Sequence, residues 1–168
     1  MKSIVLMTTL LLLILPASAG VQVDQDPQAT FDNYHTYAWR SGTDAGRAKV
    51  QEYIVSAVER ELAALGFRKV EGAGAEADLY VTTTAMANID SHLGGSAFNS
   101  DYYAIGLISA QVVATTHGSL MVDLLDGESG LPVWRGLASE TMSLPDQEKL
   151  RKKINKVVGK MFKKYPSR

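Results

Sequence analysis

Residues 118–136 read GSLMVDLLDGESGLPVWRG, and this stretch decides the fold. Large apolar residues recur at every second position up to Leu124, as in a strand that turns one face to a core. The next residues supply turn chemistry, because Asp126 can accept hydrogen bonds from the following amides and Gly130 can adopt a positive φ. Residues 133–141 then run back as the partner strand. The sequence therefore predicts a β-hairpin at the centre of an antiparallel sheet.

Two amphipathic helices are predicted outside this hairpin. From about Ala48, apolar residues recur at helical spacing up to Leu65, and Gly66 follows where a left-handed cap is needed. The second helix begins near Ser143, the expected capping residue, with a proline and an aspartate in its first turn. The apolar stripe of this second helix comprises Leu150, Ile154, Val157, Val158, Met161 and Tyr165.

Three more segments have the alternation and β-rich composition of strands: residues 34–39, 78–88 and 105–116. By contrast, residues 20–33 are polar and turn-rich, and residues 89–103 are irregular. We expect an α+β fold in which an antiparallel sheet carries both amphipathic helices on one face. Because no repeat or linker interrupts the chain, one domain is expected over residues 20–168.

The first residues have the three parts of a secretory signal. Lys2 gives a basic start, Ile4 to Leu15 is almost wholly apolar, and small residues precede Gly20 at the positions that a signal peptidase reads. The apolar run is shorter than the ~20 residues that a membrane span needs. We therefore expect residues 1–19 to be a cleaved signal peptide and the protein to be exported, with no later membrane span.

The composition excludes several kinds of site. The chain has no cysteine, so it offers no lipobox for acylation, no disulfide, no thiolate nucleophile and no zinc–thiolate centre. Loss of the signal would remove Lys2 and no acid, which takes the formal net charge from −1 to −2 and excludes bulk affinity for nucleic acid. We expect a soluble periplasmic protein of unknown oligomeric state, free or peripheral to the outer membrane.

No catalytic constellation emerges from the sequence. Motifs of serine hydrolases, phosphate loops and zinc proteases do not occur, and the three histidines lack ligand spacing. Asp123 and Asp126 have opposite parity along a strand, so their carboxylates would point to different sides. We therefore expect no catalytic residue, no cofactor, no metal and no enzyme activity, and a hydrolase of unrecognised type remains the third of three functional hypotheses.

The irregular segment 89–103 is one candidate for a binding surface. It carries Phe98, Tyr102 and Tyr103, and aromatic residues on a loop are typical of partner-binding sites. The alternative is a surface excursion without a function. The segment supports the first hypothesis, a non-catalytic binding or scaffolding module for another envelope protein.

The last helix carries the second candidate surface. At ~100° per residue, its lysines share an arc of about 120° beside the apolar stripe, and they are Lys149, Lys152, Lys153, Lys156, Lys160, Lys163 and Lys164. Such a face attracts anionic lipid or lipopolysaccharide. The alternative is a solvated helix face whose last lysines suit the helix dipole. The second hypothesis is therefore a peripheral binder of an anionic envelope surface that uses Lys152, Lys156, Lys160 and Lys163.

Several segments together carry a family resemblance. Residues 23–27 (VDQDP) and 31–39 (FDNYHTYAW) resemble the opening of the domain-of-unknown-function 4136 family. Residues 118–126 with 133–136 (VWRG) resemble its second signature, and residues 164–166 (KYP) are similar to its closing aromatic–proline. The resemblance implies an envelope protein of Gram-negative bacteria, often a lipoprotein, with no established activity. This sequence departs from that pattern because it lacks the lipobox cysteine.

Overall fold

The structure is a computed structural model that describes residues 20–43, 45–72, 76–94, 111–143 and 146–166. Its elements in chain order are β1 (Val21–Gln25), the 3₁₀ turn η1 (Phe31–Asn33), β2 (Thr36–Trp39), α1 (Ala48–Ala64), β3 (Arg68–Lys69), β4 (Leu79–Gly94), β5 (Gln111–Asp126), β6 (Pro132–Ser143) and α2 (Gln147–Phe162). The predicted signal peptide, residues 1–19, lies outside the described residues. None of the described helices is long and apolar enough to cross a membrane.

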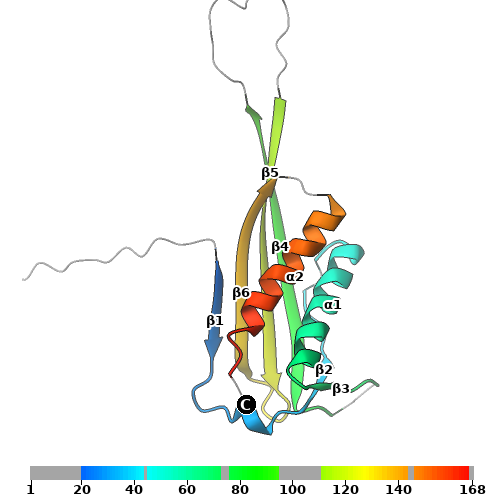
Figure 1. Ribbon diagram of the computed structural model, residues 1–168, viewed down its shortest axis with the longest axis vertical. Helices are drawn as coiled ribbons and strands as arrows, with labels where there is room; N and C mark the ends of the chain where they lie inside the picture. Colours follow the sequence, from blue (N-terminus) through cyan, green and yellow to red (C-terminus); the bar gives the residue numbers. More distant parts are fainter. Residues whose placement is uncertain (1–19, 44, 73–75, 95–110, 144–145, 167–168) are drawn as a thin grey trace, which may run out of the picture.

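The six strands form one mixed sheet in the order β1-β6-β5-β4-β2-β3 (Figure 1). Neighbouring strands pair antiparallel from β1 through β6 and β5 to β4. The predicted hairpin corresponds to the β5–β6 pair. The expectation of a wholly antiparallel sheet is wrong at the other edge, where β2 runs parallel to β3 and β4. The reason is the crossover through α1, since a strand that returns after a helix enters the sheet in the same direction.

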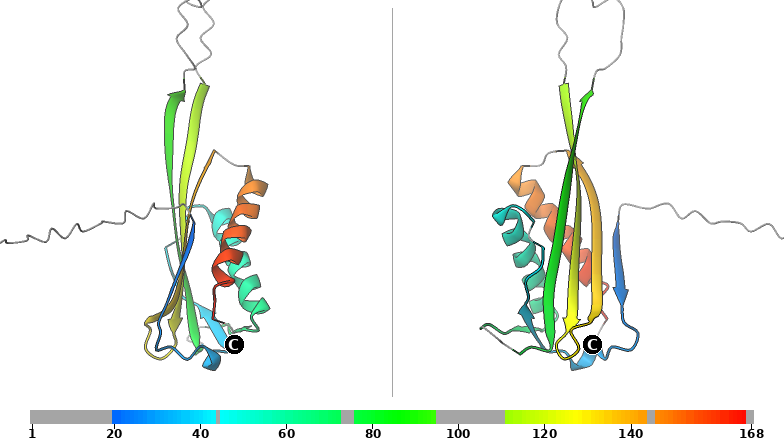
Figure 2. Two further views of the ribbon diagram at one scale, coloured as in Figure 1. Left: turned by 60° about the vertical axis from the view of Figure 1, so that its left-hand side comes forward. Right: turned by 180° about the vertical axis from the view of Figure 1, so that it is seen from behind.

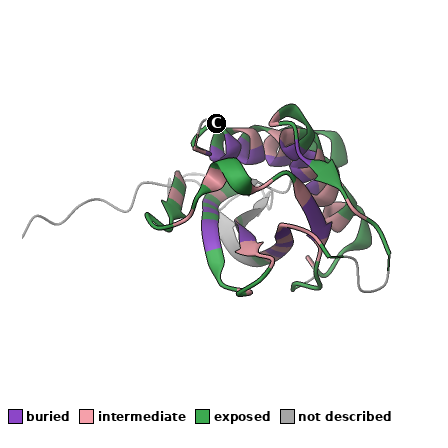
Figure 3. Cartoon of the chain, turned by 90° about the horizontal axis from the view of Figure 1, so that it is seen from below, coloured by how far each residue is buried: buried purple, intermediate pink, exposed green. Residues whose placement is uncertain are grey.

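Both helices lie on one face of the sheet, as predicted (Figure 2). Figure 3 shows the buried residues gathered between the helices and the strands. The helices contribute buried residues such as Ile54, Val58 and Val158, and the strands contribute Val122 and Leu124. Every second residue of a strand reaches this layer, so the alternation read in the hairpin does mark the core.

The C-terminus of α1 has the predicted glycine cap. Gly66 has φ 84°, and its N–H donates to the Ala63 carbonyl at 3.0 Å. The Phe67 N–H reaches back to the Leu62 carbonyl at 3.0 Å, and the Phe67 ring is buried in the core. This arrangement satisfies the last carbonyls of the helix and directs the chain into β3.

The start of α2 differs from the prediction. Ser143 is the last residue of β6, where it pairs with Thr115, and the capping residue is Asp146. The Asp146 Oδ1 accepts a hydrogen bond from the Lys149 N–H at 2.8 Å, so the cap lies three residues after the serine that was predicted to form it. The predicted apolar stripe is confirmed, and Phe162 is buried with it.

Two segments predicted as loops contain strands. Residues 21–25 form β1, which pairs with β6 and packs Val21 and Val23 against the core. Residues 89–94 continue β4, opposite residues 111–116 of β5. Backbone pairing with a neighbour decides both cases, and such pairing leaves little trace in the composition of a single segment. The predicted strand 105–116 is confirmed from Gln111, and its first residues lie outside the described part.

The β4–β5 pair extends beyond the rest of the molecule as a two-stranded ribbon (Figures 1 and 2). Strand β6 accompanies β5 only as far as the Thr115–Ser143 pair. Beyond it, residues 91–94 and 111–114 pair with each other, and no other described strand joins them. We call these two segments the distal ribbon. In the sequence, its two segments flank the predicted aromatic residues, which lie outside the described part of the chain.

Candidate functional site

The turn of the hairpin is built around the carboxylate of Asp126. Its Oδ1 accepts hydrogen bonds from the Ser129 N–H and hydroxyl, both at 2.7 Å, and its Oδ2 accepts one from the Tyr34 hydroxyl at 3.1 Å. Gly130 has φ 71° and donates its N–H to the Asp126 carbonyl at 2.9 Å. The turn chemistry read from the sequence is therefore confirmed. The contact with Tyr34, from a distant part of the chain, was not predicted.

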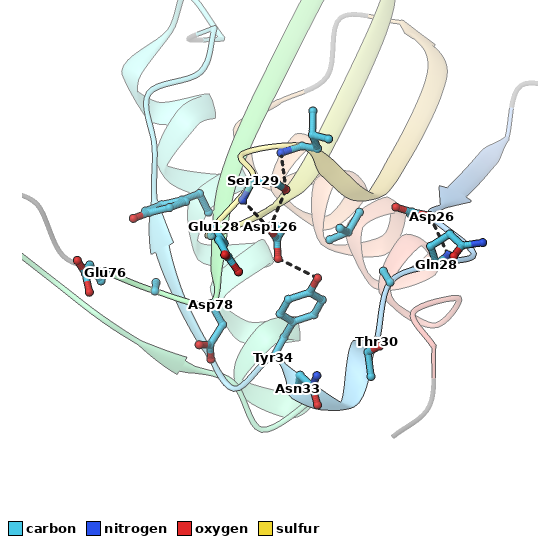
Figure 4. A pocket seen from close by; sticks show the side chains of 16 residues that line it. Asp26, Gln28, Thr30, Asn33, Tyr34, Glu76, Asp78, Asp126, Glu128 and Ser129 are labelled. Carbon is cyan, nitrogen blue, oxygen red and sulfur yellow. Dashed lines mark hydrogen bonds between the residues drawn. The ribbon is translucent and has the colours of Figure 1, made fainter.

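A polar cleft of about 900 Å³ surrounds this turn (Figure 4). Its acidic lining residues are Asp26, Glu76, Asp78, Asp126 and Glu128. In Figure 4, the ring of Tyr34, which follows η1, points toward Asp126, and Asp78 lies to the left of the ring. The Asp78 Oδ2 accepts hydrogen bonds from the N–H groups of His35 and Thr36, both at 2.8 Å, so this carboxylate fastens the start of β2 to β4.

The electrostatics of the cleft favour a structural role for these acids. Donation from Ser129 lowers the pKa of Asp126, and donation from His35 lowers the pKa of Asp78. Burial, together with the hydrogen bond to Asp126, raises the pKa of Tyr34 to about 12. A general acid at neutral pH needs a carboxyl group whose pKa is raised. Two ionised carboxylates and a neutral phenol are instead the groups of a fixed hydrogen-bond network.

Asp123 lies apart from this cleft, as its parity predicted. The side chain is on the face of β5 opposite the buried residues Val122 and Leu124. It forms a two-pronged ion pair with Arg135 on β6, with Nε–Oδ1 at 2.6 Å and Nη2–Oδ2 at 3.0 Å. Asp123 and Asp126 therefore do not form a paired-carboxylate site.

The neighbouring tryptophan explains the rest of the VWRG segment. Trp134 is 1% exposed and stacks near Phe162 at 4.9 Å between ring centroids. Its ring passes over Gly136, where a Cβ atom would lie 2.9 Å from the indole and 3.0 Å from the Met161 sulfur. The glycine therefore makes room for the indole, and Trp134 has the core role that a strand tryptophan usually has.

The rings of the two histidines whose side chains are described each lie close to a neutral oxygen atom. His35 Nδ1 lies 2.9 Å from the Asn33 carbonyl, and His117 Nδ1 lies 2.9 Å from the Thr141 hydroxyl. The side chain of His92 lies outside the described residues. Across the described part of the chain, no group of three or more His, Asp or Glu side chains could hold a metal ion.

The lysines in and just after α2 divide into those that contact the sheet, those on the outer face, and Lys149, which pairs with Asp146 at 3.3 Å. Lys153 pairs with Glu140 at 3.0 Å and donates to the Thr141 carbonyl, and Lys164 donates to the Val21 carbonyl at 2.8 Å. Both fasten the helix to the β1–β6 side of the sheet. The outer lysine face consists of the four predicted residues, all exposed: Lys152, Lys156, Lys160 and Lys163. Lys152 pairs with Glu148, and the other three contact no acid among the described residues.

The predicted aromatic site cannot be placed in the same way. Phe98, Tyr102 and Tyr103 all lie outside the described residues. The distal ribbon shows where the segment that contains them leaves and re-enters the fold. The end of β4 and the start of β5 lie at the far end of the long axis from the β5–β6 turn (Figure 1), whose residues line the polar cleft.

These features define a small α+β domain in which a mixed sheet carries two helices on one face. The chain belongs to the family described as Domain of unknown function (DUF4136), which matches residues 21–167. The family resemblance noted in the sequence is thereby confirmed. Comparison with curated proteins gave no match.

Solved structures with TM-scores above 0.5 share the fold at low sequence identity. A PDZ domain protein from Parabacteroides distasonis is similar with a TM-score of 0.57 and 14% identity over 89% of this chain, which spans only 36% of that protein. The PelC dodecamer from Paraburkholderia phytofirmans has a TM-score of 0.52 and 11% identity over 84% of this chain and 92% of PelC. Lipoprotein GNA1162 from Neisseria meningitidis has a TM-score of 0.43 and 13% identity, covering 75% of this chain and 96% of its own.

Proposed function

We propose that this protein is a non-catalytic binding or scaffolding module of the bacterial cell envelope, and that the distal ribbon carries the contact with its partner. The observation that carries this proposal is the extension of β4 and β5 beyond every other described element. The signal-like residues 1–19 support export.

Contact with a partner would stabilise a projecting two-stranded ribbon. A two-stranded hairpin by itself is marginally stable in water, and its outer edges offer backbone groups to another chain. Such edges are a common means of protein recognition. In the sequence, the aromatic residues Phe98, Tyr102 and Tyr103, which were singled out as binding candidates, lie between the two strands of the ribbon.

The fold is compatible with assembly as well as with binding to a different protein. PelC, which has a similar fold, is described as a dodecamer. A second copy of this chain is therefore one of the partners that an experiment must distinguish. A different envelope protein is the other.

The test removes the ribbon and leaves the rest of the fold. Asp90 and Thr115 lie directly opposite each other, so residues 91–114 can be replaced by an Asn-Gly turn without a change of register. The wild-type and shortened proteins are exported in cells, treated with a cross-linker, and compared by mass spectrometry of the adducts. The control is a variant with Lys156, Lys160 and Lys163 changed to Glu, which leaves the ribbon intact.

We expect discrete adducts in the wild type and in the lysine control, and none in the shortened protein. Circular dichroism should show that the shortened protein keeps its helices and a cooperative thermal transition. If a folded shortened protein gives the same adducts as the wild type, the proposal is wrong. The mass of the adduct distinguishes a second copy from a different protein.

A second candidate function rests on the outer lysine face. Lys156, Lys160 and Lys163 are exposed on one arc of α2, and no described acid neutralises them. Lysines held on one surface attract an anionic membrane, with each residue contributing about 1 kcal/mol near the surface. The face thus supports peripheral contact with lipid or lipopolysaccharide, alongside or instead of a protein partner.

Vesicle sedimentation tests this second candidate. Binding to vesicles that contain phosphatidylglycerol should fall steeply as salt rises, and the triple change of Lys156, Lys160 and Lys163 to Glu should abolish it. A matched control makes the same charge change elsewhere, at the exposed residues Lys49, Arg60 and Arg68. Equal loss in both variants would show that net charge, rather than the α2 face, drives binding.

A further inference from the structure

A second cavity lies at the end of the helix layer from which the distal ribbon departs. It has a volume of about 330 Å³ and is enclosed by α1, α2 and the strands β4, β5 and β6. It is separate from the polar cleft, with which it shares no lining residue. Its volume is at the low end of the range of about 300–1,000 Å³ that is typical of ligand pockets, which suits one slender chain.

Small residues on the sheet create this hollow. Ala87, Gly118 and Glu140 lie side by side across β4, β5 and β6, and in the next row Ala85 and Ala138 flank a leucine. A Cβ atom built on Gly118 would meet nothing closer than 4.0 Å. The equivalent atom on Gly136, two core-facing rows deeper in the sheet, would collide with Trp134. Side chains therefore fill the space between the sheet and the helices at Gly136, whereas this space is open at Gly118.

The walls of the cavity are apolar. They come from Val50 and Ile54 on α1 and from Leu150, Ile154 and Val157 on α2. Charged groups occur only at the mouth among the described lining residues, where Glu140 and Lys153 neutralise each other at 3.0 Å. An apolar chain is therefore the part of a ligand that this interior can accept.

One cationic side chain at the mouth of the cavity is not paired with a described acid. Arg47 lines the cavity, is exposed, and has no acidic partner within the described residues. It is the N-cap residue of α1, whose first turn contains no acid and whose cap receives no side-chain hydrogen bond. The guanidinium and the positive end of the helix together favour a carboxylate at this position.

We infer that this cavity binds the acyl chain of a fatty acid, with the carboxylate held by Arg47 at the start of α1. The interior takes the hydrocarbon, and the unmatched cation selects an anionic head over a neutral or cationic one. The inference is independent of the proposed role of the distal ribbon, because none of the described residues that line the cavity belongs to the ribbon.

The experiment measures laurate binding below its micellar concentration by displacement of the fluorescent fatty acid cis-parinaric acid. Dodecanol and dodecyltrimethylammonium, which carry the same chain, report the preference for the head group. Gly118→Val points a side chain into the cavity without a backbone clash, and its control is Thr82→Val on the neighbouring strand, which points away from the helices. Arg47→Glu removes the cation, and Arg68→Glu makes the same charge change outside the cavity.

We expect laurate to bind at least about tenfold more tightly than either other amphiphile, as loss of a charge-assisted hydrogen bond implies. Gly118→Val should abolish laurate binding while the melting temperature stays the same or rises. Arg47→Glu should weaken the affinity for laurate by about tenfold. Both control variants should bind laurate like the wild type. The ribbon-shortened protein should still bind laurate. Absence of laurate binding, or full binding by Gly118→Val, would overturn the inference. Equal binding of all three amphiphiles would overturn the role of Arg47.

Discussion

Arg135 on β6 holds Asp123 on β5 by two hydrogen bonds across the strand pair, with Nε–Oδ1 at 2.6 Å and Nη2–Oδ2 at 3.0 Å. The Asp123 residue is 7% exposed, whereas the Arg135 side chain is 46% exposed. The pair therefore joins an acid that has been removed from water to a base that remains largely in it. Loss of Asp123 and loss of Arg135 should therefore have different effects on the stability of the protein.

Arg135→Ala should destabilise the protein by about 1–3 kcal/mol, because Asp123 is then left buried without its charge partner. The double variant Asp123→Ala/Arg135→Ala should lose less than the sum of the two single variants, since it leaves no unpaired charge. Urea unfolding of the four proteins measures the coupling. Strictly additive losses would show that the ion pair has no net coupling.

Gly136→Ala should cost about 1–3 kcal/mol, the usual range for overpacking a core. The added methyl group meets the Trp134 indole at 2.9 Å and the Met161 sulfur at 3.0 Å. Gly118→Ala is the matched control, because it adds the same methyl group on β5 where nothing lies within 3.9 Å. The control should retain its midpoint of urea unfolding, and a loss equal to that of Gly136→Ala would refute the packing explanation.

The Asp126 network should make folding sensitive to acid. Hydrogen bonds from Ser129 and Tyr34 lower the pKa of Asp126 in the folded state below the unfolded value near 3.9. The stabilisation is therefore present above that value and is lost as pH falls through the folded pKa. Asp126→Asn should flatten the decline of the unfolding free energy between about pH 5 and pH 2. An unchanged slope would mean that other carboxylates, such as Asp78, account for the decline.

Tyr34→Phe should raise the pKa of Asp126 toward its ordinary value, because it removes the phenol that donates to Oδ2 at 3.1 Å. The Cγ chemical shift of Asp126, followed by NMR against pH, measures this change. Tyr37→Phe is a suitable comparison, since Tyr37 is buried beneath the helices and makes no recorded hydrogen bond to Asp126. A shift of equal size in both variants would indicate a general loss of packing.

The cap of α2 can be tested by Asp146→Ala, which should cost about 1 kcal/mol through loss of the 2.8 Å bond to the Lys149 amide. Glu148→Ala, a change of the same charge in the first turn, should cost less because Glu148 is not the capping residue. Thermal unfolding distinguishes the two. Equal losses would attribute the effect to helix-dipole electrostatics rather than to the cap.

The sequence contains enough information to predict the elements that have their own local pattern. The alternation in 118–136, the glycine after α1 and the apolar stripe of α2 all correspond to observed elements. Local patterns of this kind record which side of an element faces a core. From these patterns the hairpin and both helices were predicted, and so was the face of the strand on which Val122 lies.

Features that depend on distant partners were not predictable in this way. The parallel pairing of β2 follows from a crossover, and β1 becomes a strand because β6 lies beside it. The contact of Tyr34 with Asp126 joins residues 92 positions apart. In each case the deciding interaction is between segments whose proximity only the complete fold establishes.

The candidate binding surfaces also combine features that a local pattern predicts with features that depend on the complete fold. Periodicity placed Lys152, Lys156, Lys160 and Lys163 on one exposed arc, whereas the separate roles of Lys153 and Lys164 depend on where the sheet lies. The cavity beneath Gly118 had a weak signal in the sequence, a run of small residues at alternate positions of neighbouring strands. Their alignment into one row required the strand register.

The most direct test of the proposed binding role is site-specific photo-cross-linking in cells. A photoreactive amino acid is placed at Leu93 in the distal ribbon, and in a second protein at Leu131, which is 65% exposed beside the polar cleft. If the ribbon contacts the partner, Leu93 gives a discrete adduct and Leu131 gives none. An adduct from Leu131 alone, or none from Leu93 in a correctly exported and folded protein, would contradict the assignment of the binding surface to the ribbon.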